Sequence, residues 1–488
     1  MPVSKPDAPV SIGRNIKWVA LSQLARIGSQ IASVTLLARL LSPADYGLLA
    51  IASIFTNFAT LFRDFGTGSA LIQKEELSEG VKTSVFWLNM ALGLLICVTL
   101  MGASGWVASF YSSPALVPVL CLLALSFPLN CSSIVHQALL ERASQFKRIA
   151  AIESVAVVLA LVAAVSAALA GLGVYSLVLQ LLVLAVVQGG LLWWQSPWRP
   201  SLRPRWDGLR EIAGYSSNVS LFQFVNYFAR NADSFIIGKL LGPAVLGLYS
   251  VAYRLMLFPV QNMSYVVSRA VFPLMSQAHQ QGNKLADVYL RSLGVITFGS
   301  APVMAALFYF REPTIAVVFG AKWAGADALL AWLAPIGFLQ SVLSTSGSVF
   351  LATGNAGRML RYGLIGSVLQ VLAFWFGIRF GLEGLVQAYL LATVLNLLLT
   401  MHAVLGVAGA DLRGLLVCLR FQVVASIAAG GAVWAIDRWL FGAAAFGVWR
   451  LAAEYAMFSV AYLGAAAVFA PARVAVVKTM FRSKFSRP

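Results

Sequence analysis

Two sets of polar side chains recur at the same spacing inside otherwise apolar stretches of the sequence. The first set is Gln23, Arg26, Gln30 and Ser33, and the second, 200 positions later, is Gln223, Asn226, Arg230 and Asp233. The members of each set are three, four and three residues apart, so on an α-helix they fall within an arc of about 80°. Guanidinium and amide groups on such a stripe can bind anions and hydroxyl groups.

The composition indicates which elements carry these stripes. Of the 488 residues, 60% are hydrophobic and 11% are charged, and the mean hydropathy is +0.82. A chain this apolar needs a lipid bilayer, where long apolar runs satisfy their backbone hydrogen bonds as helices. The sequence therefore predicts an all-α integral membrane protein with 14 transmembrane helices. The expected spans, bounded to within about four residues, are 16–38, 46–72, 83–110, 116–140, 149–170, 173–194, 211–238, 246–277, 289–310, 326–352, 359–378, 384–407, 417–436 and 447–470.

The placement of Lys and Arg predicts the orientation of these spans. If the N-terminus lies inside and the spans alternate, the inside segments hold most of the 35 Lys and Arg residues. We therefore expect both termini in the cytoplasm. This distribution also accounts for the net charge of +17, so no nucleic-acid partner is needed. A basic inner face would attract anionic membrane lipids.

The chain repeats itself around its midpoint. Residues 21–50 and 221–250 align at an offset of 200, and Pro43 and Gly47 recur as Pro243 and Gly247. Matches between leucines alone can arise by chance, but shared Pro and Gly residues fix the backbone at a helix boundary. We therefore expect two six-helix bundles that are parallel repeats of one unit.

A basic, proline-rich segment between the sixth and seventh spans marks the boundary of the repeats. The last two spans lie outside both copies. The predicted organisation is an N-terminal bundle at 1–195, a basic cytoplasmic linker at 196–210, a C-terminal bundle at 211–408, and two additional helices with a basic cytoplasmic tail at 409–488.

Two interpretations of the stripes stay open. In the structural one, Arg230 pairs with Asp233 one turn away and the amides join neighbouring helices. In the functional one, the stripes line a hydrated cavity. A charge at the bilayer centre costs roughly 2.5–3.5 kcal/mol, so Arg26, which has no acid on its own span, must face a partner or water.

Other charged residues extend the candidate site. Arg63 and Asp64 end the second span, either as an ion pair or as part of the site, and Tyr253 and Arg254 lie in the eighth span. Arginines outnumber acids within the spans, which favours an anionic cargo.

Several classes of function lack their signatures. The sequence has no GxxxxGK[ST] loop for an ATP-driven pump. Its three histidines are scattered, and its four cysteines, all in or beside spans, are typical of packing residues. No nucleophile lies beside a base, and no predicted outside loop is long enough for a catalytic domain. We therefore expect a transporter with no catalytic residues, no metal site and no cofactor, and not an enzyme.

Longer stretches resemble a known family. They include FRDFGTGSALIQKEEL, HQALLERASQFKR, SPWRPSLRP and, most specifically, the segment from NYFARNADSF to FPLMSQ at 226–277. Over residues 10–405 the chain resembles polysaccharide transporters of the multidrug/oligosaccharidyl-lipid/polysaccharide exporter superfamily, nearest to the lipid-linked oligosaccharide flippases of the colanic acid and xanthan type.

The resemblance implies two bundles that face a central cavity and work by alternating access in the bacterial inner membrane. The cargo would be an undecaprenyl-diphosphate-linked oligosaccharide, moved to the outer leaflet for exopolysaccharide, O-antigen or capsule assembly by a polysaccharide polymerase and chain-length regulator. It also implies cationic contacts to the diphosphate. The matching candidates for substrate binding are Arg26, Gln30, Arg63, Asn226, Arg230, Asp233, Tyr253 and Arg254.

Coupling and three rival functions stay open. Asp64 or Asp233 could couple transport to H⁺ or Na⁺, although the first stripe has Ser33 where the second has Asp233. A peptidoglycan lipid-precursor flippase would share the fold and the cationic cavity. A multidrug or cation antiporter would need an acidic, aromatic cavity. An integral membrane enzyme of polysaccharide assembly would need a catalytic outside loop.

Overall fold

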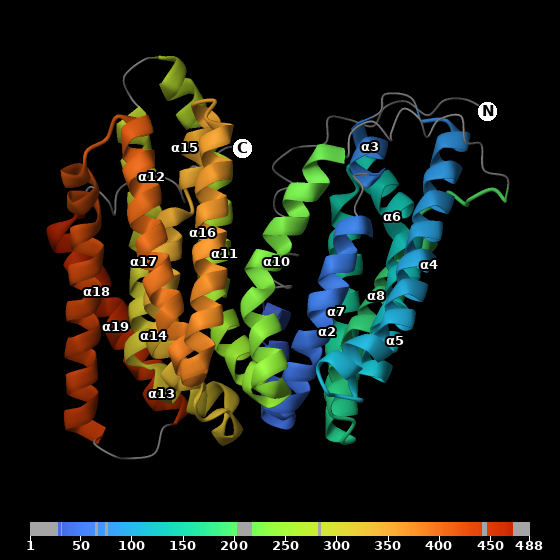
Figure 1. Cartoon of the computed structure of the whole chain (residues 1–488), viewed down its shortest axis with the longest axis horizontal. Helices are drawn as coiled ribbons and strands as arrows, with labels where there is room; N and C mark the ends of the chain where they lie inside the picture. The colour runs from blue at the N-terminus through green and yellow to red at the C-terminus, as the bar shows by residue number, and fades with distance from the viewer. Residues whose placement is uncertain are drawn as a thin grey trace. The chain divides into compact units, whose positions relative to one another are not determined.

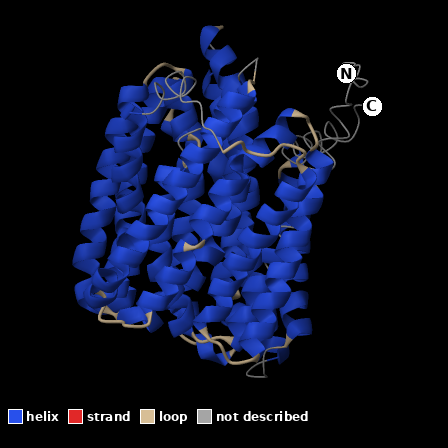
Figure 2. Cartoon of the chain, turned by 90° about the vertical axis from the view of Figure 1, so that its right-hand side faces the viewer, coloured by secondary structure: helices blue, strands red, loops and turns tan. Residues whose placement is uncertain are grey.

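The computed structural model describes residues 28–30, 32–63, 67–73, 77–202, 217–281, 285–441 and 447–471. Almost all of these residues are helical, and the described part of the chain contains no strand (Figure 2). The prediction of an all-α protein is therefore confirmed. Contacts between the helices divide the chain into a first unit that runs to Gly247 and a second that begins at Leu248.

The first unit is built from long helices that pack side by side (Figure 1). Within it, α7 packs along α8, α4 and α8 pack against α6, and α10 packs against α2. Its helices are α2 (Pro43–Arg63), α3 (Thr67–Gln73), α4 (Glu79–Phe110), α5 (Leu116–Ala124), α6 (Ser126–Arg142), α7 (Phe146–Leu169), α8 (Val174–Gln195) and α10 (Ser217–Leu240).

The second unit begins within α11 (Gly242–Gln280), because the first turn of this helix still belongs to the first unit. Here α16 packs along α17, and α12 packs against both α14 and α18. The remaining helices are α12 (Leu285–Tyr309), α13 (Arg311–Thr314), α14 (Ala326–Leu343), α15 (Ser346–Ala352), α16 (Ala356–Gly377), α17 (Gly381–Ala408), α18 (Leu412–Phe441) and α19 (Val448–Phe469).

The helices coincide with the predicted spans. Within the described residues, 11 stretches are long and apolar enough to cross a membrane, and one of them, Ala356–Ala408, contains both α16 and α17. In the most apolar part of α4 only 28% of the residues are buried, and Val98 and Trp106 are 67% and 66% exposed. Apolar side chains on an outer surface are stable when lipid covers them. The chain is therefore a multi-pass membrane protein.

The first predicted span, 16–38, lies mostly outside the described residues, although 28–30 and 32–40 are helical. Two predicted spans are interrupted. Residues 116–140 form α5 and α6, with a break at Leu125, and residues 326–352 form α14 and α15. The domain boundaries at 195 and 210 stay a prediction, because the division into units follows packing and groups α10 with the first unit.

The repeated Pro–Gly motifs meet in space. Helix α2 begins with a capping arrangement in which the Asp45 carboxylate accepts hydrogen bonds from the backbone N–H and hydroxyl of Ser42, at 2.9 and 2.6 Å. One turn into this helix, a Cβ added to Gly47 would lie 1.7 Å from the carbonyl oxygen of Pro243.

The equivalent residues of the second motif make the same contact in reverse. A Cβ added to Gly247 would lie 1.8 Å from the carbonyl oxygen of Pro43. Each glycine thus gives the other helix room for its first turn, and no larger residue fits without moving backbone. The two copies of the motif therefore pack against each other inside the first unit.

Candidate functional site

A polar cavity of about 180 Å³ lies within the first unit. Three helices and the end of a fourth form its wall: α2, α6, α8 and the last turn of α5. Seven of its lining residues are polar: Thr56, Asn57, Thr60, Arg63, Ser126, Asn130 and Gln188. Polar groups in this number are costly within membrane-spanning helices unless water or a ligand meets them.

Helical spacing produces this wall from single polar residues. On α8, Leu181, Leu184, Ala185 and Gln188 occupy positions i, i+3, i+4 and i+7 and therefore share one face. The lining residues of α2 and α6 follow the same rule. Helices α2, α6 and α8 contribute four, two and one of the polar side chains. These side chains come together only because the helices pack in one unit.

Most of the small polar groups in the wall use their donors locally. The hydroxyls of Thr60 and Ser126 donate to the carbonyl oxygens of Asn57 and Leu123, both at 2.6 Å. The amide nitrogen of Asn130 donates to the carbonyl oxygen of Ser126 at 2.8 Å. These bonds use donors, so the same hydroxyl and amide oxygens can still accept hydrogen bonds.

Arg63 is the predicted site residue that the structure brings to this cavity. It is the last residue of α2, and its side chain is half-buried. Among the described lining residues it carries the only formal charge. The cavity thus combines one permanent cation with amide and hydroxyl groups, a set that suits an anion with hydroxyl-bearing groups next to it.

The two predicted stripes have matching environments at equivalent positions. Gln30 and Arg230 are both exposed, whereas Ser33 and Asp233 are both buried. The Ser33 hydroxyl accepts a hydrogen bond of 2.7 Å from the amide of Gln180 on α8. The Asp233 carboxylate accepts one of 2.6 Å from the backbone N–H of Ser234. Equivalent positions of the two stripes are therefore buried or exposed alike.

The other predicted site residues do not converge in the described part of the chain. Tyr253 and Arg254 lie on α11 in the second unit, where the Tyr253 ring stacks on Tyr249 at 5.5 Å and the Arg254 side chain is exposed. Arg26, Asp64 and the side chain of Asn226 lie outside the described residues. The substrate and coupling roles of all these residues stay predictions.

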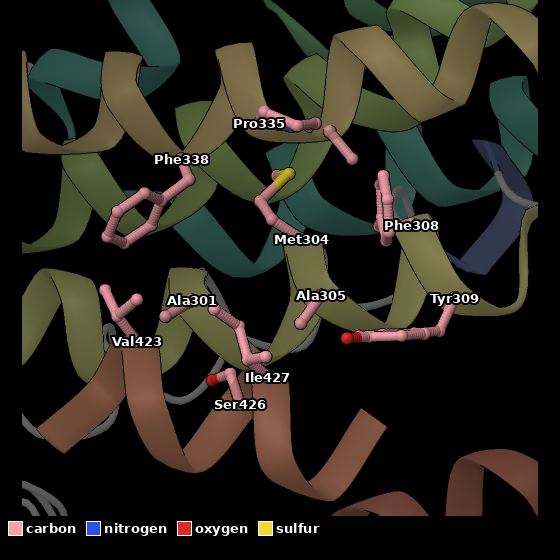
Figure 3. A pocket seen from close by; sticks show the side chains of 11 residues that line it. Ala301, Met304, Ala305, Phe308, Tyr309, Pro335, Phe338, Val423, Ser426 and Ile427 are labelled. Carbon is pink, nitrogen blue, oxygen red and sulfur yellow. The ribbon is translucent and has the colours of Figure 1, made fainter. Parts of the chain in front are cut away.

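A second cavity, of about 290 Å³, lies within the second unit and has a different character. Figure 3 shows its lining side chains, which come from α12, α14 and α18 and include Met304, Phe308, Phe338 and Ile427. Apart from the hydroxyls of Ser426 and Tyr309, these side chains are apolar. Such a wall offers no site for a charged headgroup.

Sequence reasoning missed a buried ionic group at the α18–α19 hairpin. The guanidinium of Arg450 makes two hydrogen bonds to the carboxylate of Asp437, at 2.9 and 2.6 Å, and its Nε lies 3.5 Å from Glu454 Oε1. All three side chains are buried. The signal available was the i, i+4 spacing of Arg450 and Glu454. No cluster of three or more metal-binding side chains occurs in the described ranges.

Curated relatives match this chain over most of its length. It is 27% identical over 414 residues to the teichuronic acid biosynthesis protein TuaB of Bacillus subtilis (strain 168), covering 81% of this chain and 86% of that protein. It is 29% identical over 387 residues to the succinoglycan biosynthesis transport protein ExoT of Rhizobium meliloti (strain 1021), covering 79% and 78%.

A solved structure shares the fold. The lipid II flippase MurJ in an inward closed conformation superposes with a TM-score of 0.71 at 14% identity, over 93% of this chain and 100% of that one. At this identity the likeness concerns the fold alone. Residues 36–327 match the model of a family described as polysaccharide biosynthesis protein. With more than half of its residues matched, the chain belongs to this polysaccharide biosynthesis family.

Proposed function

We propose that this protein moves an undecaprenyl-diphosphate-linked oligosaccharide repeat unit from the inner to the outer leaflet of the bacterial inner membrane by alternating access. The observation that carries the proposal is the polar cavity with Arg63 in its wall, inside a multi-pass protein of a polysaccharide biosynthesis family. A relative named as a transport protein for succinoglycan biosynthesis supports the same conclusion.

The chemistry of the cargo explains why a protein is needed. A diphosphate carries two or more negative charges and cannot enter hydrocarbon unaided. Arg63 offers a permanently charged, bidentate donor to a phosphate, and Arg230 presents a second exposed guanidinium. The undecaprenyl chain stays in lipid while the sugars cross through polar surroundings. The protein binds and releases its cargo unchanged, so we infer that it is a transporter and not an enzyme.

The excess of Lys and Arg in alternate loops favours cytoplasmic termini. We propose that the cargo is loaded from that cytoplasmic side. Release at the outer leaflet would deliver the repeat unit to a polysaccharide polymerase and chain-length regulator. Asp233, a carboxylate that is only 3% exposed within a predicted span, is our candidate for coupling to H⁺ or Na⁺.

Lipid extracts from cells that lack the gene test this function. The proposal expects undecaprenyl-diphosphate-linked repeat units to accumulate while surface polysaccharide is lost, and expects the intact gene to reverse both changes. Accumulation of the peptidoglycan lipid precursor would instead assign the chain to that flipping step. Normal lipid-linked pools with altered drug sensitivity would refute the proposal and favour an antiporter.

A further inference from the structure

Two amides in the wall of the polar cavity have no partner. The side chains of Asn57 on α2 and Gln188 on α8 make no hydrogen bond to any residue that the structure describes. This separates them from Asn130 and from the hydroxyls of Thr60 and Ser126, which bond to backbone carbonyls three or four residues away. Both amides lie in helices that are apolar enough to span a membrane.

An unpartnered amide at such a position needs a polar ligand. Asn57 is exposed and Gln188 is partly buried, and both are polar groups on helices that can span a membrane, where an amide without a polar partner is costly. Water or a cargo group must therefore meet Asn57 and Gln188. Each amide presents an acceptor oxygen and two N–H donors. A sugar hydroxyl also donates and accepts, so a pair of amides matches it better than a group that only accepts. Leu181 and Leu184, on the same wall, can pack against the C–H faces of a sugar ring.

The size of the cavity limits what it can hold. A volume of about 180 Å³ is below the roughly 300–1,000 Å³ of pockets that enclose drug-sized ligands. The cavity therefore suits one sugar ring, and the rest of a repeat unit would lie outside it.

Arg63 places an anion next to that ring. Asn57 and Arg63 lie six residues apart on α2, which corresponds to a rise of about 9 Å. We propose that the cavity is a sugar subsite in which Asn57 and Gln188 bind the hydroxyls of one sugar ring while Arg63 holds the adjoining phosphate. This rests on the proposed function and adds that the cavity selects cargo by one hydroxyl-rich ring near the diphosphate.

Binding to the purified full chain in lipid nanodiscs, followed by native mass spectrometry, tests the subsite. The two probes are undecaprenyl diphosphate without sugar and the lipid-linked repeat unit extracted from cells that lack the protein. One neutral hydrogen bond corresponds to a factor of about five in affinity. We expect Asn57→Leu and Gln188→Met each to weaken binding of the repeat unit by roughly 5- to 30-fold and to leave undecaprenyl diphosphate binding unchanged.

Two further variants separate the binding of the phosphate from the binding of the sugar. Arg63→Gln should weaken both probes, because it removes the phosphate contact. Gln195→Met is a matched control, since Gln195 lies on α8 but outside the cavity, and it should change neither. Retained binding of undecaprenyl diphosphate shows that the amide variants are folded.

The failures of the two proposals are distinguishable. If the amide variants weaken both probes equally, or neither, the sugar subsite is overturned while the flippase function stands. If the unmodified protein binds neither probe, the proposed function itself is overturned, and the subsite with it.

Discussion

The reciprocal contact of the two Pro–Gly motifs allows a sharp test by Gly47→Ala. The added Cβ would lie 1.7 Å from the carbonyl oxygen of Pro243 and 2.4 Å from its carbonyl carbon. Real Cβ contacts are essentially never shorter than 3.0 Å, so the two helix starts must separate by at least 1.3 Å. The obstructing atoms are backbone and cannot rotate away. Overpacking usually costs about 1–3 kcal/mol, and we expect the upper end of that range.

The assay is thermal unfolding of the purified protein in one detergent. A loss of about 3 kcal/mol predicts a fall in Tm of about 6–12 °C for a unit of this size. Gly105→Ala is the matched control, because Gly105 lies in α4 with nothing within 4 Å of its added Cβ, and its Tm should change little. If Gly47→Ala behaves like this control, the motifs do not pack as described.

The second glycine provides an internal check. Gly247→Ala should cost a similar amount, since its Cβ would lie 1.8 Å from the carbonyl oxygen of Pro43. One separation of the helix starts relieves both clashes. The double variant should therefore lose clearly less than the sum of the two single losses. Strict additivity would mean that the two sites do not share a displacement.

Three further predictions concern charge and access. Arg230→Ala should reduce export at least about tenfold, which is the effect of losing one charge-assisted hydrogen bond. Protein levels should not change, because the side chain is exposed. Full export would show that Arg230 does not bind the cargo. A cysteine at Gln30, in a chain without its native cysteines, should react with a membrane-impermeant thiol reagent, whereas one at the buried Ser33 should not; equal reactivity would contradict the stripe. Arg450→Met should lower the free energy of unfolding by about 3–5 kcal/mol, because two buried carboxylates lose their cation. The control Arg438→Met removes an exposed arginine and should be nearly neutral. Equal unfolding temperatures of the two variants would refute the buried ion pair.

Hydropathy located the helices well because the bilayer sets their length and polarity. The predicted spans 149–170 and 173–194 correspond to α7 and α8 within a few residues. The breaks between α5 and α6 and between α14 and α15 were not predictable in this way, since each interrupted pair remains one apolar run. They depend on how neighbouring helices pack.

The candidate site was only partly predictable. Arg63 stood out because a charge in a span is costly. Asn57, Asn130 and Gln188 did not, since each is a single polar residue on a different helix, and such residues usually serve packing. Their common function depends on tertiary contacts between α2, α6 and α8, which the order of residues along one helix does not reveal.

Flipping by the purified protein tests the central claim most directly. Proteoliposomes would carry the lipid-linked repeat unit in both leaflets, and a membrane-impermeant oxidant that cleaves sugar diols would report the fraction exposed outside. With the protein present, we expect nearly all of the lipid to become oxidised. Liposomes without protein, and those with the Arg63→Gln variant, should stop near the half that starts outside. If the intact protein also stops at half, it does not move this cargo between leaflets.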